Sequence, residues 1–221
     1  MLAARTRPFT SAAPTRRAVV THSSLKLYTN PASRGKIVEW YLQEIGVDAE
    51  LVNLDLKERQ HKTEDFMKVN PFGKVPAMQD GSLSLFESGA LLTYLADKYG
   101  KLDTPEARAR ASQWVLFANS TLANSVFVEQ FREKSMPDVM GNLDKILAGR
   151  EFIEGDAFSV SDVAVGAYLL YIPAFLPQID LSPYPNVVAY MQRMAARPAC
   201  ASTVAARATQ RKEEEKAAAK N

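Results

Sequence analysis

The sequence has few of the side chains that build redox and metal sites. Cys200 is the single cysteine among 221 residues, which excludes an internal disulfide, a CxxC pair and a cysteine-based zinc site. His22 and His61 are the two histidines, too few for a histidine-based metal site. We therefore expect no bound metal, and any thiol chemistry must come from a ligand.

Long hydrophobic runs are also missing. The longest apolar stretch, residues 163–175, is interrupted by Gly166 and Pro173. It is also shorter than the roughly 20 apolar residues that a membrane-spanning helix needs. With 47% hydrophobic and 24% charged residues, the composition is typical of a soluble globular protein. We expect no membrane association.

Acidic residues are absent from residues 1–24, MLAARTRPFTSAAPTRRAVVTHSS, which contain four arginines. This composition is typical of an organellar transit peptide, and the alternative is a disordered N-terminus. The Ser, Thr and Pro content favours the chloroplast over the mitochondrion, and the cytoplasm is the remaining alternative. Beyond this segment, 23 Lys and Arg stand against 25 Asp and Glu, so we expect no binding to nucleic acid.

Residues 25–98 predict a small α/β domain. Gly46 is expected to end the first helix as a C-cap, and Asp80-Gly81 predicts a hairpin turn. The apolar spacing predicts strands near 25–28, 49–54, 75–78 and 83–86, and helices at 34–45, around residue 66 and at 88–99. The element order is therefore β-α-β-α-β-β-α.

The second half has no strand pattern. Residues 99–104 form the expected linker, and helical periodicity covers an all-helical domain at residues 105–206, with Pro105 in a first turn. Ser159 and Asp162 have the spacing of a capping box, which we interpret as a folding device. Residues 207–221 form a charged tail that we expect to be solvated and partly helical.

Three segments of the first domain suggest chemistry. Ser33 precedes the first helix, where a hydroxyl either caps the helix or, with the helix dipole, stabilises a bound thiolate. A cis Val75-Pro76 bond would leave the Val75 backbone free for an extended peptide, although trans is the commoner form. Glu87 and Ser88 open the third helix, where they form either an ordinary N-terminus or a site for an ammonium and a carboxylate.

Long stretches of the chain resemble glutathione S-transferases, most closely the phi class. The resemblance rests on KLYTNPAS (residues 26–33) and QHKTEDFMKVNPFGKVPAMQDGSLSLFES (residues 60–88) and extends over residues 25–205. It implies a thioredoxin-like α/β first domain, an all-α second domain, glutathione as co-substrate and a homodimer.

The resemblance also assigns roles to individual residues. Ser33 matches the serine that stabilises the glutathione thiolate. The glutathione-binding positions are His61 and Lys74 for the glycyl carboxylate, Val75 and cis Pro76 for the cysteinyl unit, and Glu87 and Ser88 for the γ-glutamyl end.

The sequence departs from the phi pattern in places. Arg34 and Gly35 follow Ser33 directly, so Arg34 is an alternative cation for the thiolate. Lys74 stands where Gln is frequent in the phi class, and Gly89 where Arg is frequent. No cysteine lies near this turn, so thiol exchange through an enzyme cysteine is not expected. Cys200 is expected to be a small packing residue.

The resemblance predicts a glutathione transferase that presents the thiolate to a hydrophobic electrophile or a hydroperoxide. Glutathione peroxidase or isomerase activity would use the same residues. The alternative is a non-catalytic carrier or scaffold that binds a hydrophobic or tetrapyrrole-like ligand. Aromatic residues of the helical half are candidates for an apolar substrate pocket or for the core: Trp114, Phe117, Tyr168, Tyr171 and Phe175.

Overall fold

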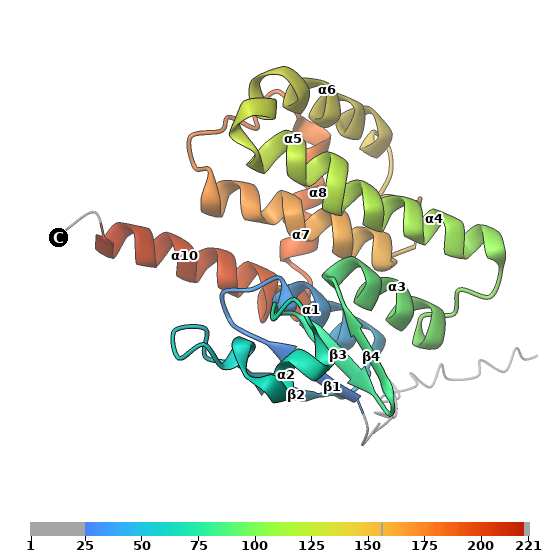
Figure 1. Cartoon of the computed structure of the whole chain (residues 1–221). Helices are drawn as coiled ribbons and strands as arrows, with labels where there is room; N and C mark the ends of the chain where they lie inside the picture. Colours follow the sequence, from blue (N-terminus) through green and yellow to red (C-terminus); the bar gives the residue numbers. More distant parts are fainter. Residues whose placement is uncertain (1–24, 156, 219–221) are drawn as a thin grey trace, which may run out of the picture.

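The computed structural model describes residues 25–155 and 157–218. These residues form a small sheet with its helices, followed by a larger group of helices (Figure 1). The expected transit peptide, residues 1–24, lies outside the described residues.

The first part of the chain is built on a sheet with the strand order β2-β1-β3-β4. β1 runs parallel to β2 and antiparallel to β3, and β3 is antiparallel to β4. The strands are β1 (Leu25–Thr29), β2 (Glu50–Asn53), β3 (Ala77–Asp80) and β4 (Leu83–Phe86). A βαβ unit followed by a hairpin confirms the expected thioredoxin-like α/β fold.

The predicted strand at 75–78 begins two residues too early. β3 begins at Ala77, directly after Pro76, because proline has no N–H for the strand ladder. β3 is also a central strand, paired with β1 on one side and β4 on the other. Val75 therefore lies just before a central strand and not at the edge of the sheet.

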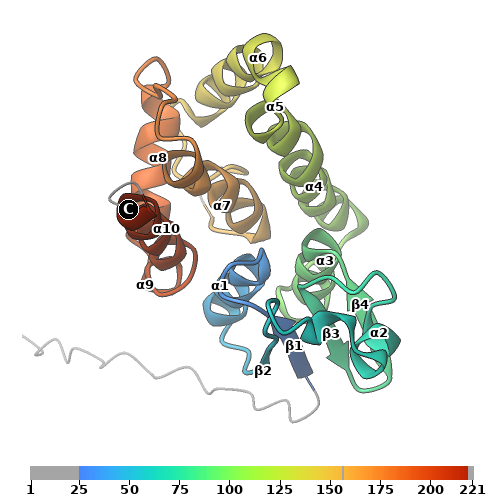
Figure 2. The same cartoon turned by 60° about the vertical axis from the view of Figure 1, so that its left-hand side comes forward.

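Two helices of the first part lie between the sheet and the helical part, as Figure 2 shows for α1 and α3. α1 ends at Gly46, whose φ of 65° is the expected left-handed C-cap. Thr63 caps α2 by accepting a hydrogen bond from the Phe66 N–H. The elements are α1 (Gly35–Ile45), η1 (Gln60–Lys62), α2 (Glu64–Val69) and α3 (Ser88–Tyr99).

The second part consists of helices joined by loops in its described residues. Pro105 begins its first helix, and Thr104 caps it by accepting a hydrogen bond from the Ala107 N–H. A π-helical turn, η2, joins this helix to the next. The elements are α4 (Pro105–Leu116), η2 (Phe117–Leu122), α5 (Ala123–Phe127), α6 (Glu129–Leu147), α7 (Val160–Phe175), α8 (Pro185–Ala195), α9 (Pro198–Ala201) and α10 (Val204–Ala218).

Helix α7 runs through the core of the helical part. Nearly all of its side chains are buried, and it begins with the predicted capping box of Ser159 and Asp162. The Asp162 carboxylate accepts hydrogen bonds from the Ile153 N–H and the Tyr190 hydroxyl, at 2.8 and 2.9 Å. The box therefore anchors α7, so that residues farther along the helix have fixed positions.

The predicted boundary between residues 206 and 207 falls inside helix α10 (Val204–Ala218). Ala, Arg, Lys and Glu are strong helix formers, and no Gly or Pro follows the boundary to end the helix. Arg207 is only 8% exposed, so the expectation of a solvated tail is wrong at this residue.

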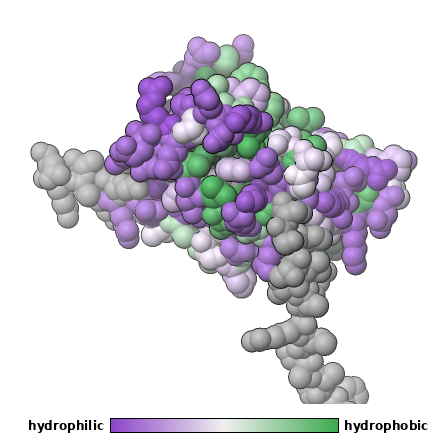
Figure 3. All heavy atoms as spheres, turned by 60° about the horizontal axis from the view of Figure 1, so that its bottom comes forward, coloured by the Kyte–Doolittle hydropathy of each residue, from purple (hydrophilic) through white to green (hydrophobic). Residues whose placement is uncertain are grey.

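Hydrophilic side chains cover most of the face drawn in Figure 3, with hydrophobic residues gathered near its centre. Within residues 25–155 and 157–218, no helix has the length and apolar character needed to cross a membrane.

Candidate active site

Strand register brings three distant segments to one end of the sheet. Tyr28 of β1 pairs with Ala77 of β3, and Ala77 pairs with Phe86 of β4. The residues that follow β1, precede β3 and follow β4 therefore leave the sheet side by side. These are the segments 30–34, 74–76 and 87–88, which contain all the predicted site residues except His61.

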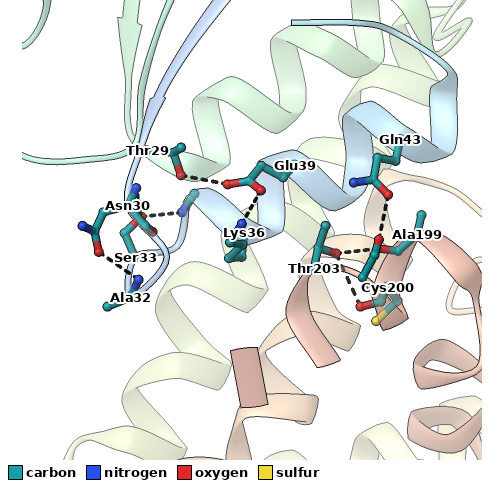
Figure 4. A network of polar contacts seen from close by, with 12 residues as sticks. Thr29, Asn30, Ala32, Ser33, Lys36, Glu39, Gln43, Ala199, Cys200 and Thr203 are labelled. Atoms are coloured by element: carbon teal, nitrogen blue, oxygen red, sulfur yellow. Dashed lines mark hydrogen bonds and ion pairs between the residues drawn. The ribbon is translucent and has the colours of Figure 1, made fainter. Parts of the chain in front are cut away.

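The Ser33 hydroxyl is part of a tight turn, shown in Figure 4. Its Oγ donates to the Asn30 carbonyl at 2.8 Å and accepts from the N–H groups of Asn30 and Gly35, at 3.3 and 3.0 Å. The hydroxyl has one proton, which the Asn30 carbonyl already accepts. A ligand thiolate would have to compete for that proton.

Gly35 lets helix α1 approach strand β1 closely. A Cβ at this position would lie 2.0 Å from Thr29 Oγ1 and 3.0 Å from Ser33 Oγ. Thr29 Oγ1 in turn donates to the buried Glu39 carboxylate at 2.9 Å, and Lys36 Nζ lies 2.5 Å from the other carboxylate oxygen (Figure 4). The charge of Glu39 is therefore paired, as a buried carboxylate requires.

Arg34 extends from the same turn toward the helical part. Its Nη1 donates to the Tyr168 hydroxyl at 3.1 Å, although part of the residue is exposed. Desolvation alone would lower the pKa of the Arg34 guanidinium, but the Tyr168 hydroxyl and the Glu87 carboxylate raise it above its ordinary value. Arg34 thus remains a cation, with further N–H donors available to a ligand.

The Val75-Pro76 peptide bond is cis, as the resemblance implied. Among the described residues, the backbone N–H and C=O of Val75 make no hydrogen bond. Lys74 is exposed, and its carbonyl accepts a hydrogen bond from Asn70 Nδ2 at 2.7 Å.

His61 lies in η1, against the loop that leads to Val75. A Cβ on Gly73 would lie 2.6 Å from the His61 carbonyl oxygen, and Lys62 Nζ donates to the Phe72 carbonyl at 3.0 Å. His61 Nδ1 is buried and has no hydrogen-bond partner. The loop thus holds His61 near residue 74, although no described contact joins the two side chains.

Glu87 and Ser88 occupy contrasting environments at the start of α3. Glu87 is exposed and has a φ of 71°, a left-handed value that is uncommon for a residue with a side chain. Ser88 is 2% exposed, and its Oγ donates a long hydrogen bond of 3.4 Å to Asn119 Oδ1. The Ser88 hydroxyl therefore contacts the helical part of the chain, which sequence reasoning did not anticipate.

A cavity of about 200 Å³ adjoins the Ser33 turn. Its walls are Ala32, Ser33 and Arg34 from the first part of the chain and Phe127, Tyr168, Tyr171, Phe175 and Arg207 from the helices. Burial raises the pKa of Tyr171 well above its ordinary range, so this hydroxyl is neutral. The cavity can accept a small apolar group beside the Ser33 turn.

Sequence reasoning found part of this aromatic lining. Tyr168, Tyr171 and Phe175 line the cavity, whereas Trp114 and Phe117 pack on each other with ring centroids 5.4 Å apart. Phe127 and Arg207 were missed. Arg207 follows the apolar Val204 by three residues, which places both on one face of a helix. This spacing could have indicated that Arg207 faces the core.

The thiol of Cys200 does not line the cavity. Cys200 is buried, and burial raises the pKa of its thiol to about 12, which keeps it protonated. In residues 25–155 and 157–218, no group of three or more His, Cys, Asp or Glu side chains could hold a metal ion.

Two family models match the chain. One is described as "Glutathione S-transferase, N-terminal domain" and covers residues 23–97. The other, described as "Glutathione S-transferase, C-terminal domain", covers residues 108–207. The chain belongs to the glutathione S-transferase family. The family that the sequence resemblance indicated is therefore confirmed.

Relatives of this transferase come from distant organisms. Glutathione S-transferase 3 of Zea mays is 32% identical over 82% of this chain and 94% of its own length. Disulfide-bond oxidoreductase YfcG of Escherichia coli is 30% identical over 79% of this chain and 92% of its own. A solved structure of a glutathione transferase family member from Pseudomonas fluorescens pf-5, "with two glutathione bound", is 30% identical in sequence. The match covers 82% of this chain and 92% of that chain, with a TM-score of 0.70.

The close packing at Gly35 in this transferase predicts a severe effect of substitution. Gly35→Ala should lower the free energy of unfolding by about 2–3 kcal/mol, because the methyl group overlaps Thr29. Urea denaturation measures this loss.

A second glycine provides the matched control. A Cβ on Gly141, inside α6, would meet no atom within 4 Å. Gly141→Ala should therefore stabilise the protein by up to about 1 kcal/mol through helix propensity. Equal effects of the two substitutions would contradict the packing argument.

Proposed function

We propose that the protein binds glutathione at the shared strand end and promotes attack of its thiolate on a hydrophobic electrophile or a hydroperoxide. The observation that carries the proposal is the meeting of residues 30–34, 74–76 and 87–88 beside an aromatic cavity. Glutathione bound in the Pseudomonas fluorescens neighbour supports it, as do the names of the curated relatives.

In this proposal the three segments hold different parts of glutathione. The free backbone N–H and C=O of Val75 pair with the cysteinyl unit as a strand would. The exposed Glu87 carboxylate accepts the γ-glutamyl ammonium, and the Ser88 N–H at the start of α3 donates to the adjacent carboxylate. His61 and Lys74 supply donors for the glycyl carboxylate.

The thiolate has two candidate partners, Ser33 and Arg34. The Ser33 proton already goes to the Asn30 carbonyl at 2.8 Å, whereas Arg34 uses one N–H for Tyr168 and has further N–H donors. We therefore assign the larger share of thiolate stabilisation to Arg34 and a smaller share to Ser33. One unit of thiol pKa corresponds to about 1.4 kcal/mol, the scale of one charge-assisted hydrogen bond.

Once formed, the thiolate attacks the electrophile in the aromatic cavity. The sulfur lone pair forms the new bond to carbon, the leaving group departs with its electron pair, and the thiol proton passes to solvent. The enzyme contributes orientation and charge stabilisation and forms no covalent intermediate.

A second candidate function is disulfide reduction. A relative named a disulfide-bond oxidoreductase is 30% identical, and the Pseudomonas fluorescens neighbour holds two glutathione molecules. In such a reaction one glutathione thiolate attacks a substrate disulfide, and a second glutathione resolves the mixed disulfide. The products are oxidised glutathione and the substrate dithiol, so the buried Cys200 is not needed.

Titration of the full-length protein with glutathione, followed by a steady-state screen of electrophiles, hydroperoxides and disulfides, tests these functions.

Arg34→Gln should raise the pKa of the bound thiol by about one unit and lower kcat/KM roughly tenfold below that pKa. Ser33→Ala should have the smaller effect. Absence of glutathione binding would refute the proposal, and binding without turnover would indicate the carrier alternative.

We also propose a homodimer formed through the face of β4, α3 and α4. Leu83 and Leu116, 40% and 65% exposed, border a groove of about 600 Å³ on this face. Exposed apolar groups around such a groove are typical of a protein interface.

Leu116→Glu should convert the dimer to a monomer, because it places a charge on this apolar face. Analytical ultracentrifugation measures the change. Phe131→Glu is the matched control, since Phe131 is an exposed apolar residue on α6, away from this groove. A wild-type monomer, or a dimer that survives Leu116→Glu, would contradict the proposed interface.

We further propose that residues 1–24 direct the protein to the chloroplast, on the basis of their Arg-rich, acid-free composition. A fluorescent protein fused behind residues 1–24 should accumulate in chloroplasts of plant protoplasts, and the fluorescent protein alone should not. Accumulation in mitochondria or retention in the cytoplasm would refute this destination.

A further inference from the structure

A chain of side-chain hydrogen bonds joins the Ser33 turn to the start of α3 through the helical part. Arg34 Nη1 donates to the Tyr168 hydroxyl at 3.1 Å, and this hydroxyl donates to Asn119 Oδ1 at 2.9 Å. The same Oδ1 accepts the 3.4 Å hydrogen bond from Ser88. Tyr168 lies on α7, and Asn119 lies in the π-helical turn η2.

The direction of every bond in this chain is fixed. A guanidinium can only donate, so the Tyr168 oxygen must accept from Arg34 and use its one proton toward Asn119. The Asn119 amide cannot turn over, because its Nδ2 donates to the Val115 carbonyl at 2.9 Å. The Asn119 oxygen is therefore held toward Tyr168 and Ser88.

The surrounding packing keeps these groups in place. Tyr168 is 6% exposed, and the centroid of its ring lies 6.2 Å from that of Phe127. Gly89 lets Asn119 approach α3, since a Cβ there would lie 3.0 Å from both Asn119 Nδ2 and Val115 Cγ1. A side chain at position 89 would therefore require Asn119 or Val115 to shift by a few tenths of an ångström.

Arg34 has a competing partner within the site. Arg34 and Glu87 line the same groove, yet among the described residues they form no ion pair within 4.0 Å. The Tyr168 hydroxyl gives the guanidinium a neutral acceptor instead. This arrangement leaves the Glu87 carboxylate available to a ligand cation, and it leaves Arg34 beside Ser33.

We propose that Tyr168 and Asn119 are positioning residues that hold the Arg34 guanidinium at the thiol site and away from Glu87. Arg34 is the catalytic residue, and the two helical residues act through it. The inference rests on the proposed function, because it assumes that the glutathione sulfur binds beside Ser33 and Arg34.

The proposal predicts two effects of removing the Tyr168 hydroxyl. Without this acceptor, Arg34 turns toward Glu87, so the thiolate loses its cation and the γ-glutamyl ammonium loses part of its carboxylate. The charged or titratable groups that line a cavity with Arg34 are Glu87, Tyr94, Tyr168, Tyr171 and Arg207. Of these, only Glu87 is an anion that can take the place of the hydroxyl.

The experiment measures the pKa of the bound thiol by the ultraviolet absorbance of the thiolate, together with KM for glutathione. Tyr168→Phe keeps the ring and should raise the thiol pKa by roughly 0.5–1 unit, about three to tenfold less thiolate below that pKa. KM for glutathione should rise about threefold or more. Asn119→Leu should shift both values in the same direction, by less.

A double-mutant cycle separates positioning from a general structural effect. In the Arg34→Gln background, Tyr168→Phe should change the thiol pKa by less than about 0.2 unit, because the residue through which it acts is gone. Tyr184→Phe is the control for loss of a phenol hydroxyl, since its hydroxyl makes no hydrogen bond within the described part of the chain. It should leave the thiol pKa unchanged.

Two results would overturn the inference while leaving the proposed function intact. The first is that the Tyr168→Phe variant lowers the pKa of the bound glutathione thiol by as much as the wild-type protein does. The second is a Tyr168→Phe effect of the same size with and without Arg34. If Tyr168→Phe does not fold, Asn119→Leu provides the same comparison. A wild-type protein that does not bind glutathione would refute the proposed function, and the inference with it.

Discussion

The pairing of Ala77 with Tyr28 on one side and Phe86 on the other determines where the rest of the site lies. These pairs end the ladders of β1, β3 and β4 at the same level, so the loops beyond them emerge together. A shift of one residue in either pairing would turn alternate side chains from the core to the opposite face. The buried Leu27 and Met78 oppose such a shift. Core packing therefore fixes the site geometry through the sheet register.

A second constraint acts at the junction of β1 and α1. Gly35 lies so close to Thr29 that the turn between them has little freedom, and the Ser33 hydroxyl is one of its structural bonds. The same hydroxyl is thus a turn-forming group and a candidate donor to a ligand. The reaction of this family uses the thiol of glutathione. The single cysteine of the chain is therefore not needed for it, and this cysteine is buried and protonated.

The helical part supplies polar groups as well as the apolar wall of the cavity. Its helix α7 is anchored by the capping box and by the Asp162–Tyr190 hydrogen bond, which leaves Tyr168 in a fixed position two turns farther along. The π-helical turn η2 brings Asn119 Oδ1 within 2.9 Å of the same hydroxyl. Polar groups of both parts of the chain therefore meet at Arg34, where the chemistry of the proposed function would take place.

Features set by neighbouring residues followed from the sequence: the helix at 88–99, the C-cap at Gly46 and the capping box at Ser159. The resemblance added the cis Val75-Pro76 bond. The tertiary structure alone decided that Ser88 bonds to Asn119 and that Arg34 bonds to Tyr168, 134 residues away. Local hydrogen bonding and capping depend on residues within a few positions of each other, so the sequence specifies them directly. The meeting of distant side chains depends on how helices pack, and the periodicity of one segment carries no information about which face of another it will contact.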